Sequence, residues 1–367
     1  MNIRRPVLRL HGAYEVENFG DILLARIFAD WAREAGWEPI TIGAPDYVHR
    51  DLNLSPDVTD APRAVLLVGG GYLGEPKRSL PGRWNWGFKL VERHLSVMAE
   101  ARSKNLPYAV IGAGFGPISN LFARWKAKSL MKGAAAIVLR DPESANWAKQ
   151  YGVRCDAISA DAAVTLSNTP LNAIAQTEAA RFRAQAEGRK IVAVQFDRAP
   201  SGADEWAVVF DELEKRLHGL DCFVVGISDQ RGTAVAEMHR QAAELFLTRF
   251  PNGRFEAYDG LDSMLGRLSA ADLIITTKLH IGIVGSAYGR AVLSLPTHQK
   301  TVRFYRQLER TQVCVPKADW SSASISAAFD QAWALVDKTP LTVPEALTRA
   351  SRSNAEYVNA FLNKSAG

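Results

Sequence analysis

The sequence contains few cysteines, and their positions exclude two classes of protein. Among 367 residues there are only three, Cys155, Cys222 and Cys314, and none belongs to a CxxC motif or a cysteine–histidine cluster. An odd, scattered set does not form a disulfide framework, and its spacing does not match a structural zinc site. We therefore expect a protein of a reducing compartment.

Long apolar runs are missing as well. The N-terminus, MNIRRPVLRLHG, has no apolar stretch of signal-peptide length, and no segment approaches the roughly 18 to 20 apolar residues that cross a bilayer. We expect a cytoplasmic protein. The net charge of +5 suits an anionic substrate, an acidic lipid surface or a nucleic acid. The sequence lacks zinc-finger spacing, an aromatic RNA-binding motif and a dense basic arm, so it predicts no nucleic-acid partner.

Short apolar runs alternate with helical patterns along the chain. The runs are continuous, as in strands that are buried on both faces of a parallel sheet. They occur at 7–10, 64–68, 108–111, 136–139, 191–195, 222–226, 254–257, 273–277 and 291–295. This pattern predicts an α/β fold of two doubly wound, Rossmann-like domains whose parallel sheets face a cleft. We place the domains at 1–168 and 169–340, with a C-terminal helix in 341–367 that packs back across them.

The residues that follow each predicted strand are the candidates for a site, because ligands bind beyond the carboxyl ends of strands in open α/β sheets. After the first run, Asn18 leads into a helix that Asp21 opens. Asp21 is either a helix cap or a catalytic group that accepts a proton from a hydroxyl. After 64–68 comes a glycine run that includes Gly70 and Gly71, which forms either a tight turn or a close approach of backbone to ligand.

Two further strand ends carry aromatic and glycine-rich segments. Trp84 and Trp86 lie among cations in 76–89, which is either a sugar-stacking segment or an ordinary surface loop. The segment GAGFGP at 112–117 resembles a dinucleotide fingerprint, but Pro117 stands where the last glycine is required. We therefore reject NAD binding.

Charged residues follow two other runs. Arg140 comes directly after 136–139. It either makes an ion pair with neighbouring acids or clamps a carboxylate or phosphate with two hydrogen bonds. Asp161 ends a short run near 155–158, and we expect it to reach the same cleft.

The segment TTKLHIG, residues 276–282, contains the clearest candidates. Here a strand ends and a helix begins, and a helix N-terminus binds anions through its free N–H groups. Lys278 adds a cation, and Gly282 keeps the helix slim. A histidine side chain titrates near neutrality, so His280 is suited to proton transfer, although a lone histidine is more often structural.

Residues 120–135 form a basic amphipathic stretch. Leu121, Phe122 and Trp125 alternate there with arginine and lysine. The stretch is either a helix that lies on an anionic membrane surface or an ordinary helix with a solvated basic face. The first alternative would place the protein at the inner face of the cytoplasmic membrane.

Together these segments resemble the polysaccharide pyruvyltransferase family over about residues 8–310. The matching features, in chain order, are Asn18-x-Gly20-Asp21, the glycines of 69–71, the GxGP-like end of 112–117, Arg140-Asp141-x-x-Ser144, Tyr-Gly-Val at 151–153, Asp161, Leu279-His280 before a small-residue helix, and Lys300.

The resemblance implies a fold similar to the two-domain glycosyltransferases of the B type. Family members transfer pyruvate from phosphoenolpyruvate to sugar hydroxyls of an exopolysaccharide or other cell-surface glycan precursor, often as a cyclic ketal. It implies that Arg140, Lys278 and Lys300 bind the donor, with His280 as the proton donor and the second domain as the donor side. The scheme requires no metal and no cofactor. The family's block reads Arg-Leu-His, and here Lys278 keeps the charge of the arginine but not its planar, two-pronged geometry.

The same residues are compatible with two other functions. A nucleotide-sugar glycosyltransferase of the same architecture also binds phosphates at helix N-termini, and a fold does not determine a function. The third reading is a non-catalytic carbohydrate-binding relative of the family. The acceptor in the first reading is a sugar or a lipid-linked oligosaccharide.

Overall fold

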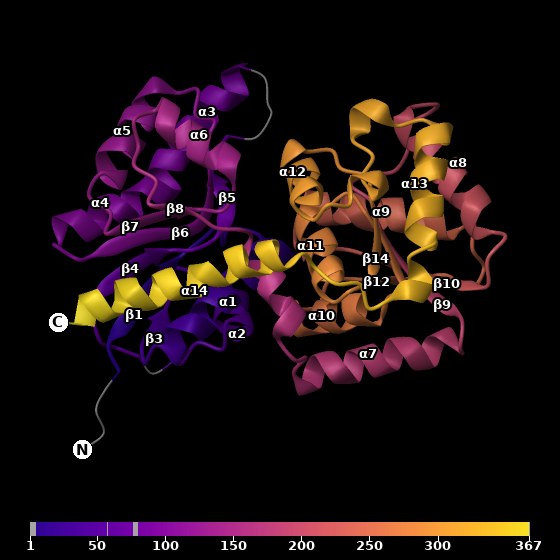
Figure 1. Cartoon of the computed structure of the whole chain (residues 1–367), viewed down its shortest axis with the longest axis horizontal. Coiled ribbons are helices and arrows are strands. Elements are labelled where there is room, and N and C mark those ends of the chain that lie inside the picture. Colours follow the sequence, from indigo (N-terminus) through magenta and orange to yellow (C-terminus); the bar gives the residue numbers. More distant parts are fainter. Residues whose placement is uncertain (1–4, 57, 76–79, 367) are drawn as a thin grey trace. The chain divides into compact units, whose positions relative to one another are not determined.

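The computed structural model describes residues 5–56, 58–75 and 80–366, which divide into two compact units (Figure 1). The first contains the described residues of Met1–Glu15, Asp21–Ala162 and Thr348–Gly367, and the second contains Val16–Gly20 and Ala163–Leu347. Each is built around a parallel sheet with helices on both faces. The predicted α/β, doubly wound class is confirmed.

The sheet of the first unit has the order β3-β1-β4-β6-β7-β8, and β5 pairs with β6. All pairings are parallel. The strands are almost entirely buried, because continuous apolar runs such as AVLL leave no polar face for solvent. Their bounds are β1 (Val7–His11), β3 (Glu38–Ile40), β4 (Ala64–Leu67), β5 (Gly70–Leu73), β6 (Tyr108–Phe115), β7 (Ala136–Leu139) and β8 (Ala157–Ile158).

Helices cover both faces of this sheet. One face carries α3 (Leu80–Leu90), a π-helical turn at Val91–Leu95, α4 (Ser96–Ser103), α5 (Leu121–Met131) and α6 (Pro142–Gln150). The other carries α1 (Phe19–Glu34) and α14 (Glu345–Ala366), with α2 (Asp46–Asp51) in the connection that follows β3. The predicted C-terminal helix is α14. Its Ser351 Oγ and Asn354 Nδ2 donate hydrogen bonds of 2.7 and 2.9 Å to the backbone oxygens of Asp161 and Ala160.

The sheet of the second unit has the order β12-β10-β9-β13-β14 and is also parallel. Its strands are β9 (Lys190–Gln195), β10 (Cys222–Ile227), β12 (Arg254–Glu256), β13 (Leu273–Thr276) and β14 (Ala291–Ser294). Its helices are α7 (Ala173–Ala186), α8 (Glu205–Leu217), α9 (Ala234–Leu247), α10 (Leu261–Ala270), α11 (Leu279–Ala287), α12 (Gln299–Gln307) and α13 (Ser322–Trp333). Because the strand order reverses between β9 and β13, this pair is the topological switch point, where open α/β sheets bind ligands.

A short N-terminal segment belongs to the second unit. β2 (Glu17–Asn18) pairs antiparallel with β11 (Gln230–Arg231), and the Phe19 backbone N–H donates 2.8 Å to the Asp229 oxygen. The division therefore differs from the proposed boundary at residue 168, which assigned Val16–Gly20 and 163–168 to the N-terminal domain. Residues Ala162–Asn168, next to the proposed boundary, form a 3-10 helix. No helix of the described residues is long and apolar enough to cross a membrane.

Candidate functional site

The switch point of the second unit carries an ion-pair cluster. Asp197 follows β9, Asp229 follows β10 and Lys278 follows β13, so parallel pairing brings the three side chains to one edge of the sheet. The Lys278 Nζ lies 3.0 Å from Asp197 Oδ1 and 4.0 Å from Asp229 Oδ2. The predicted cation is therefore present at the strand end, and two carboxylates hold it.

The charges of this cluster stabilise one another. Burial acts to raise the pKa of Asp197, but the Lys278 ammonium and hydrogen bonds from Lys278 and Thr277 outweigh it and bring that pKa to about 2. The pKa of Asp229 is also lowered, again against burial and chiefly by Lys278. Burial opposes the charge of Lys278 as well, yet Asp229 and Asp197 raise its pKa. All three groups are therefore ionised at neutral pH.

A buried histidine lies beneath the cluster. His239 of α9 is 1% exposed, and its Nδ1 lies 3.0 Å from Asp229 Oδ1. Sequence reasoning missed Asp197, Asp229 and His239. Asp197 comes two residues after the apolar run at 191–195 and Asp229 three residues after the run at 222–226, which is a usable signal. His239 lies inside a helix and has no such signal.

His280 lies in the first turn of α11, directly after this cluster. Its ring packs on Gly20 so closely that a Cβ added to Gly20 would be 1.9 Å from His280 Nδ1. Gly20 is itself fixed, because its N–H donates 3.1 Å to Asn18 Oδ1. Only glycine leaves room for the imidazole in this position, so Asn18, Gly20 and His280 form one assembly of the second unit.

Two other predicted donor residues lie on neighbouring helices of the second unit. Gly282 of α11 faces the Tyr305 hydroxyl, which a Cβ at Gly282 would approach to 2.7 Å. At Gly282, α11 thus packs closely against α12, whereas Gly285 of the same helix packs against Ile274 of β13. Lys300 is an exposed residue in the first turn of α12.

Arg140 lies in the first unit, where carboxylates surround it. Its NH1 is 3.2 Å from Asp161 Oδ2, its Nε is 3.7 Å from Asp141 Oδ2, and the side chain is 8% exposed. A Cβ on Gly71 would lie 3.3 Å from its guanidinium. The structure brings Arg140, Asp161 and Gly71 together. Of the two alternatives predicted for Arg140, its contacts are those of an ion pair with neighbouring acids.

Asp21 and Gly70 are neighbours in the first unit. Asp21 is in the first turn of α1, and a Cβ at Gly70 would lie 3.6 Å from its Oδ1. Gly70 has φ +133°, a conformation that L-residues rarely adopt. Burial, with Asp21 as a smaller contributor, raises the pKa of both Tyr14 and Tyr72, so these phenols stay neutral beside the carboxylate.

The two predicted stacking tryptophans differ in exposure. Trp84 is 52% exposed on α3, whereas Trp86 packs against the core of the first unit. Residues 76–79 of the same predicted segment lie outside the described residues. Among the residues that the structure does describe, no group of three or more His, Cys, Asp or Glu side chains is arranged to hold a metal ion.

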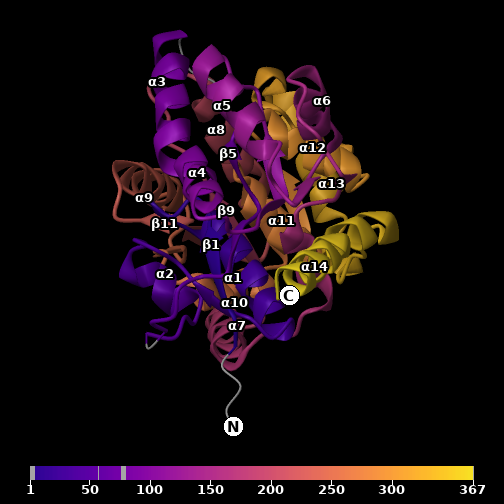
Figure 2. The ribbon, with the colours of Figure 1, turned by 90° about the vertical axis from the view of Figure 1, so that its left-hand side faces the viewer.

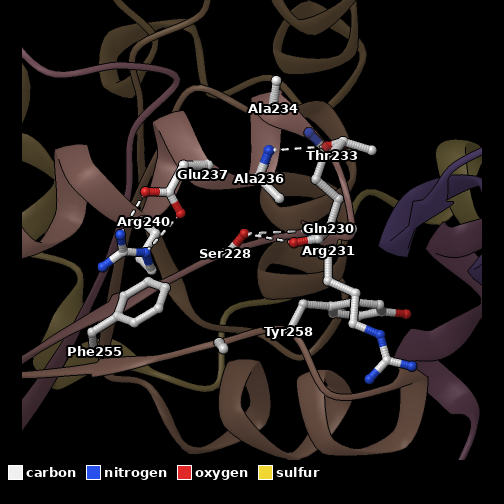
Figure 3. A pocket seen from close by; sticks show the side chains of 12 residues that line it. Ser228, Gln230, Arg231, Thr233, Ala234, Ala236, Glu237, Arg240, Phe255 and Tyr258 are labelled. Atoms are coloured by element: carbon white, nitrogen blue, oxygen red, sulfur yellow. Dashed lines mark hydrogen bonds and ion pairs between the residues drawn. The ribbon is translucent and has the colours of Figure 1, made fainter.

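A pocket of about 410 Å³ lies beyond β10 and β12 (Figure 3). Arg231 and Tyr258 line one side of it, and the Glu237–Arg240 ion pair lines the other. Arg231 Nε is held 2.6 Å from Glu17 Oε2. Because its lining comes from separate loops and a helix, sequence reasoning did not find this pocket.

The comparisons with known proteins assign the family. A family model described as polysaccharide pyruvyl transferase matches residues 18–299. The chain belongs to this family. The protein is therefore a transferase of polysaccharide biosynthesis, and the matched residues include both Asn18–Asp21 and the Lys278–His280 segment. No protein with a curated description matches the sequence.

Solved structures of low sequence identity share the fold of this transferase. HepE of Anabaena, in complex with UDP and glucose, is 12% identical over 99% of both chains, with a TM-score of 0.57. UDP-GlcNAc 2-epimerase from Neisseria meningitidis, bound to UDP-GlcNAc, is 13% identical over 98% of this chain and 100% of that chain, with a TM-score of 0.60. A putative UDP-N-acetylglucosamine 2-epimerase from Listeria monocytogenes is 10% identical over 98% of this chain and 97% of that chain, with a TM-score of 0.61. The predicted B-type glycosyltransferase fold is confirmed.

Proposed function

We propose that this transferase moves pyruvate from phosphoenolpyruvate to hydroxyl groups of a sugar or lipid-linked oligosaccharide, a precursor of an exopolysaccharide or another cell-surface glycan. The observation that carries the proposal is the position of His280. It stands in the first turn of α11, at the switch point of the second sheet and beside a charged lysine. Such an edge offers a proton donor and anion-binding groups to the same ligand.

Phosphoenolpyruvate needs a site that accepts two anionic groups, a carboxylate and a phosphate. The free N–H groups of the first turn of α11 are suited to one of them, because a helix N-terminus carries partial positive charge. Lys278 contributes an adjacent ammonium, but the two ionised carboxylates of Asp197 and Asp229 more than balance it, so the anion-binding groups in our proposal are chiefly these backbone N–H groups. Lys300, at the start of α12, is a further donor-binding group in our proposal. Arg140 acts in the first unit by orienting Asp161.

The reaction proceeds by protonation of the donor. His280 gives a proton to the methylene carbon of phosphoenolpyruvate, which becomes a methyl group and leaves the neighbouring carbon electrophilic. A sugar hydroxyl adds to that carbon and loses its proton to Asp21. Cleavage of the carbon–oxygen bond releases phosphate, which takes up the proton from Asp21. A second hydroxyl then closes the ketal, and its proton returns to His280. The net products are one pyruvyl ketal and one phosphate. In our proposal the acceptor binds beside Asp21, next to Gly70 and Gly71.

Mass analysis of the products tests the proposal. The protein is incubated with phosphoenolpyruvate and a panel of nitrophenyl glycosides and lipid-linked sugars, and phosphate release is measured in parallel. We expect the acceptor to gain one pyruvyl unit and phosphate to appear in equal amount. A parallel arm replaces phosphoenolpyruvate with nucleotide sugars. Glycosyl transfer in that arm would support a glycosyltransferase, and acceptor binding without any phosphate release would support a non-catalytic relative.

A further inference from the structure

The exposed aromatic side chains of this protein are concentrated in one place. Of the phenylalanines and tryptophans in the described ranges, the exposed ones are Trp84 (52%), Phe88 (49%), Phe122 (50%) and Trp125 (64%). Two belong to α3 and two to α5, which lie side by side in the first unit (Figures 1 and 2). Leu121 adds a further apolar side chain that is 66% exposed.

Close packing between the two helices makes these side chains one surface. Asn120, the N-cap of α5, donates 3.3 Å from its Nδ2 to the Trp84 oxygen. A Cβ on Gly87 would be 2.4 Å from the Asn120 Cβ, so the backbones approach as closely as they can. We call the side chains of Trp84, Phe88, Leu121, Phe122 and Trp125 the aromatic patch. Exposed apolar residues gathered in this way mark an interaction site.

The two helices that carry the aromatic patch have charges of a single sign. The described helices α3 and α5 contain no acidic residue, and they carry Arg83, Lys89, Arg124, Lys126 and Lys128. Lys126 Nζ lies 5.9 Å above the Phe122 ring. Tryptophan and phenylalanine next to cations are typical of surfaces that rest in the interface of an anionic bilayer, with rings among the acyl chains and cations at the phosphates.

A pocket of about 380 Å³ opens beside the patch. Arg83 of α3, Arg124 of α5, and Trp147 and Tyr151 of the α6 region line it. Glu75 lines it as well, and its carboxylate accepts hydrogen bonds from the backbone N–H and the hydroxyl of Ser119. Two nitrogens of Arg124, Nε and NH2, donate 3.0 and 2.8 Å to the Ile118 oxygen, and its guanidinium lies 4.4 Å above the Tyr151 ring. The described residues give Arg124 no carboxylate partner. A half-buried guanidinium that is held in place with its charge unbalanced favours an anion.

We propose that the ends of α3 and α5 dock on an anionic lipid bilayer, with the aromatic patch in the interface and a lipid phosphate in the Arg83–Arg124 pocket. Trp84 is then a membrane contact rather than a sugar-stacking residue. The surface gives the transferase access to substrates that are anchored in lipid. The docking itself is independent of the donor and of the reaction proposed above.

Co-sedimentation of the full-length protein with vesicles tests the docking. We expect binding to vesicles of equal parts phosphatidylcholine and phosphatidylglycerol, and much weaker binding to phosphatidylcholine alone. Phe122→Ser with Trp125→Ser should weaken binding at least about tenfold, because two interfacial side chains are lost. Lys126→Gln and Lys128→Gln should each weaken binding to the anionic vesicles about fivefold, and a high salt concentration should also weaken this binding. The matched control is Val235→Ser with Met238→Ser, which removes similarly exposed apolar side chains from α9 and should change nothing.

Variants of Arg124 and a soluble phosphate test the pocket. Arg124→Gln should reduce binding to the anionic vesicles, and Arg124→Lys should restore part of it. Glycerol 3-phosphate should compete only weakly, because it lacks acyl chains for the patch. Equal binding of the Phe122/Trp125 variant and the wild type would overturn the docking surface, as would equal binding to neutral and anionic vesicles. Tight binding of free glycerol 3-phosphate would assign the pocket to a soluble ligand. Thermal unfolding of each variant verifies its fold, and the assays contain no phosphoenolpyruvate, so their outcome is separate from that of the transfer reaction.

Discussion

The strand order reverses between β1 and β4 in the first unit and between β9 and β13 in the second. Polar side chains gather at both reversals, but their charge states differ. Beside β1, His11 Nε2 lies 2.9 Å from His94 Nδ1, and burial lowers the pKa of these histidines to about 3 and about 4. Beside β9, Asp197 and Lys278 form an ion pair of 3.0 Å.

The difference in charge state between the two reversals suits two different kinds of ligand. Around His11 the buried histidines and tyrosines are neutral at pH 7, with the Asp21 carboxylate nearby at the start of α1. Around Lys278 the groups are ionised, and a helix N-terminus follows at once. A neutral sugar hydroxyl is suited to the first environment and an anionic donor to the second. The comparison therefore supports a division of labour between an acceptor unit and a donor unit.

The largest expected effect comes from removing the proton donor of the second unit. His280→Ala should lower pyruvyl transfer by about 10²–10⁴-fold, the usual contribution of general acid catalysis. Phosphate release from phosphoenolpyruvate plus acceptor measures it, and thermal unfolding should be unchanged. The matched variant is His218→Gln, at an exposed site of the second unit, which should retain most of the activity. Turnover of His280→Ala at the wild-type rate would remove His280 from the mechanism.

Removing the cation of the second unit should lower stability. Lys278→Met leaves Asp197 and Asp229 without their ammonium, and we expect a loss of about 3 kcal/mol in the free energy of unfolding, at the lower end for buried pairs because the pair is partly exposed. The pKa of Asp197 is about 2 in the folded protein against an ordinary 3.8, so its contribution is complete above about pH 4 and is lost as the pH falls toward 2.

Urea denaturation of wild type and Lys278→Met at several pH values measures this contribution. The difference between them should be largest near pH 7 and should narrow below pH 4. Lys278→Arg, which restores the family's residue and keeps the charge, is the control and should lose much less. A Lys278→Met protein as stable as the wild type at pH 7 would mean that the two carboxylates do not depend on this lysine.

A smaller effect is expected where glycine makes room for His280. Gly20→Ala adds a Cβ that would lie 1.9 Å from His280 Nδ1, so the imidazole has to move. A displacement of about 1 Å at a reacting group costs about 100-fold in rate. Gly219→Ala is the control, since no atom lies within 4 Å of the added Cβ. An active Gly20→Ala enzyme with unchanged KM and kcat would show that His280 need not keep this position.

The sequence predicted the strands and the strand-end residues because both depend on local patterns. Buried parallel strands are continuous apolar runs, and Arg140, Lys278 and His280 follow such runs directly. For Arg140 the sequence left two alternatives, and its contacts are those of the ion pair. The pairing of β2 with β11 and the place of His239 beneath Asp229 were not predicted. The first joins segments about 200 residues apart and the second joins residues 10 apart, and both depend on tertiary contacts that no local pattern encodes.

A last effect concerns the neutral histidines of the first unit and is confined to acid pH. The unfolded chain protonates His11 and His94 near pH 6.5, whereas the folded protein does so only near pH 3 and 4. Their contribution to stability is therefore complete above about pH 6.5. It is lost as the pH falls from there to the folded values, at about 1.4 kcal/mol per pH unit for each histidine. His94→Gln keeps a polar partner for His11 and removes one of the two protons, so it should halve this part of the slope between pH 6 and pH 4, measured by urea denaturation. His218→Gln, at an exposed site, should leave the slope of the wild type. An equal slope in His94→Gln would mean that His94 is charged in the folded protein, and the contrast between a neutral and an ionic edge would then fail.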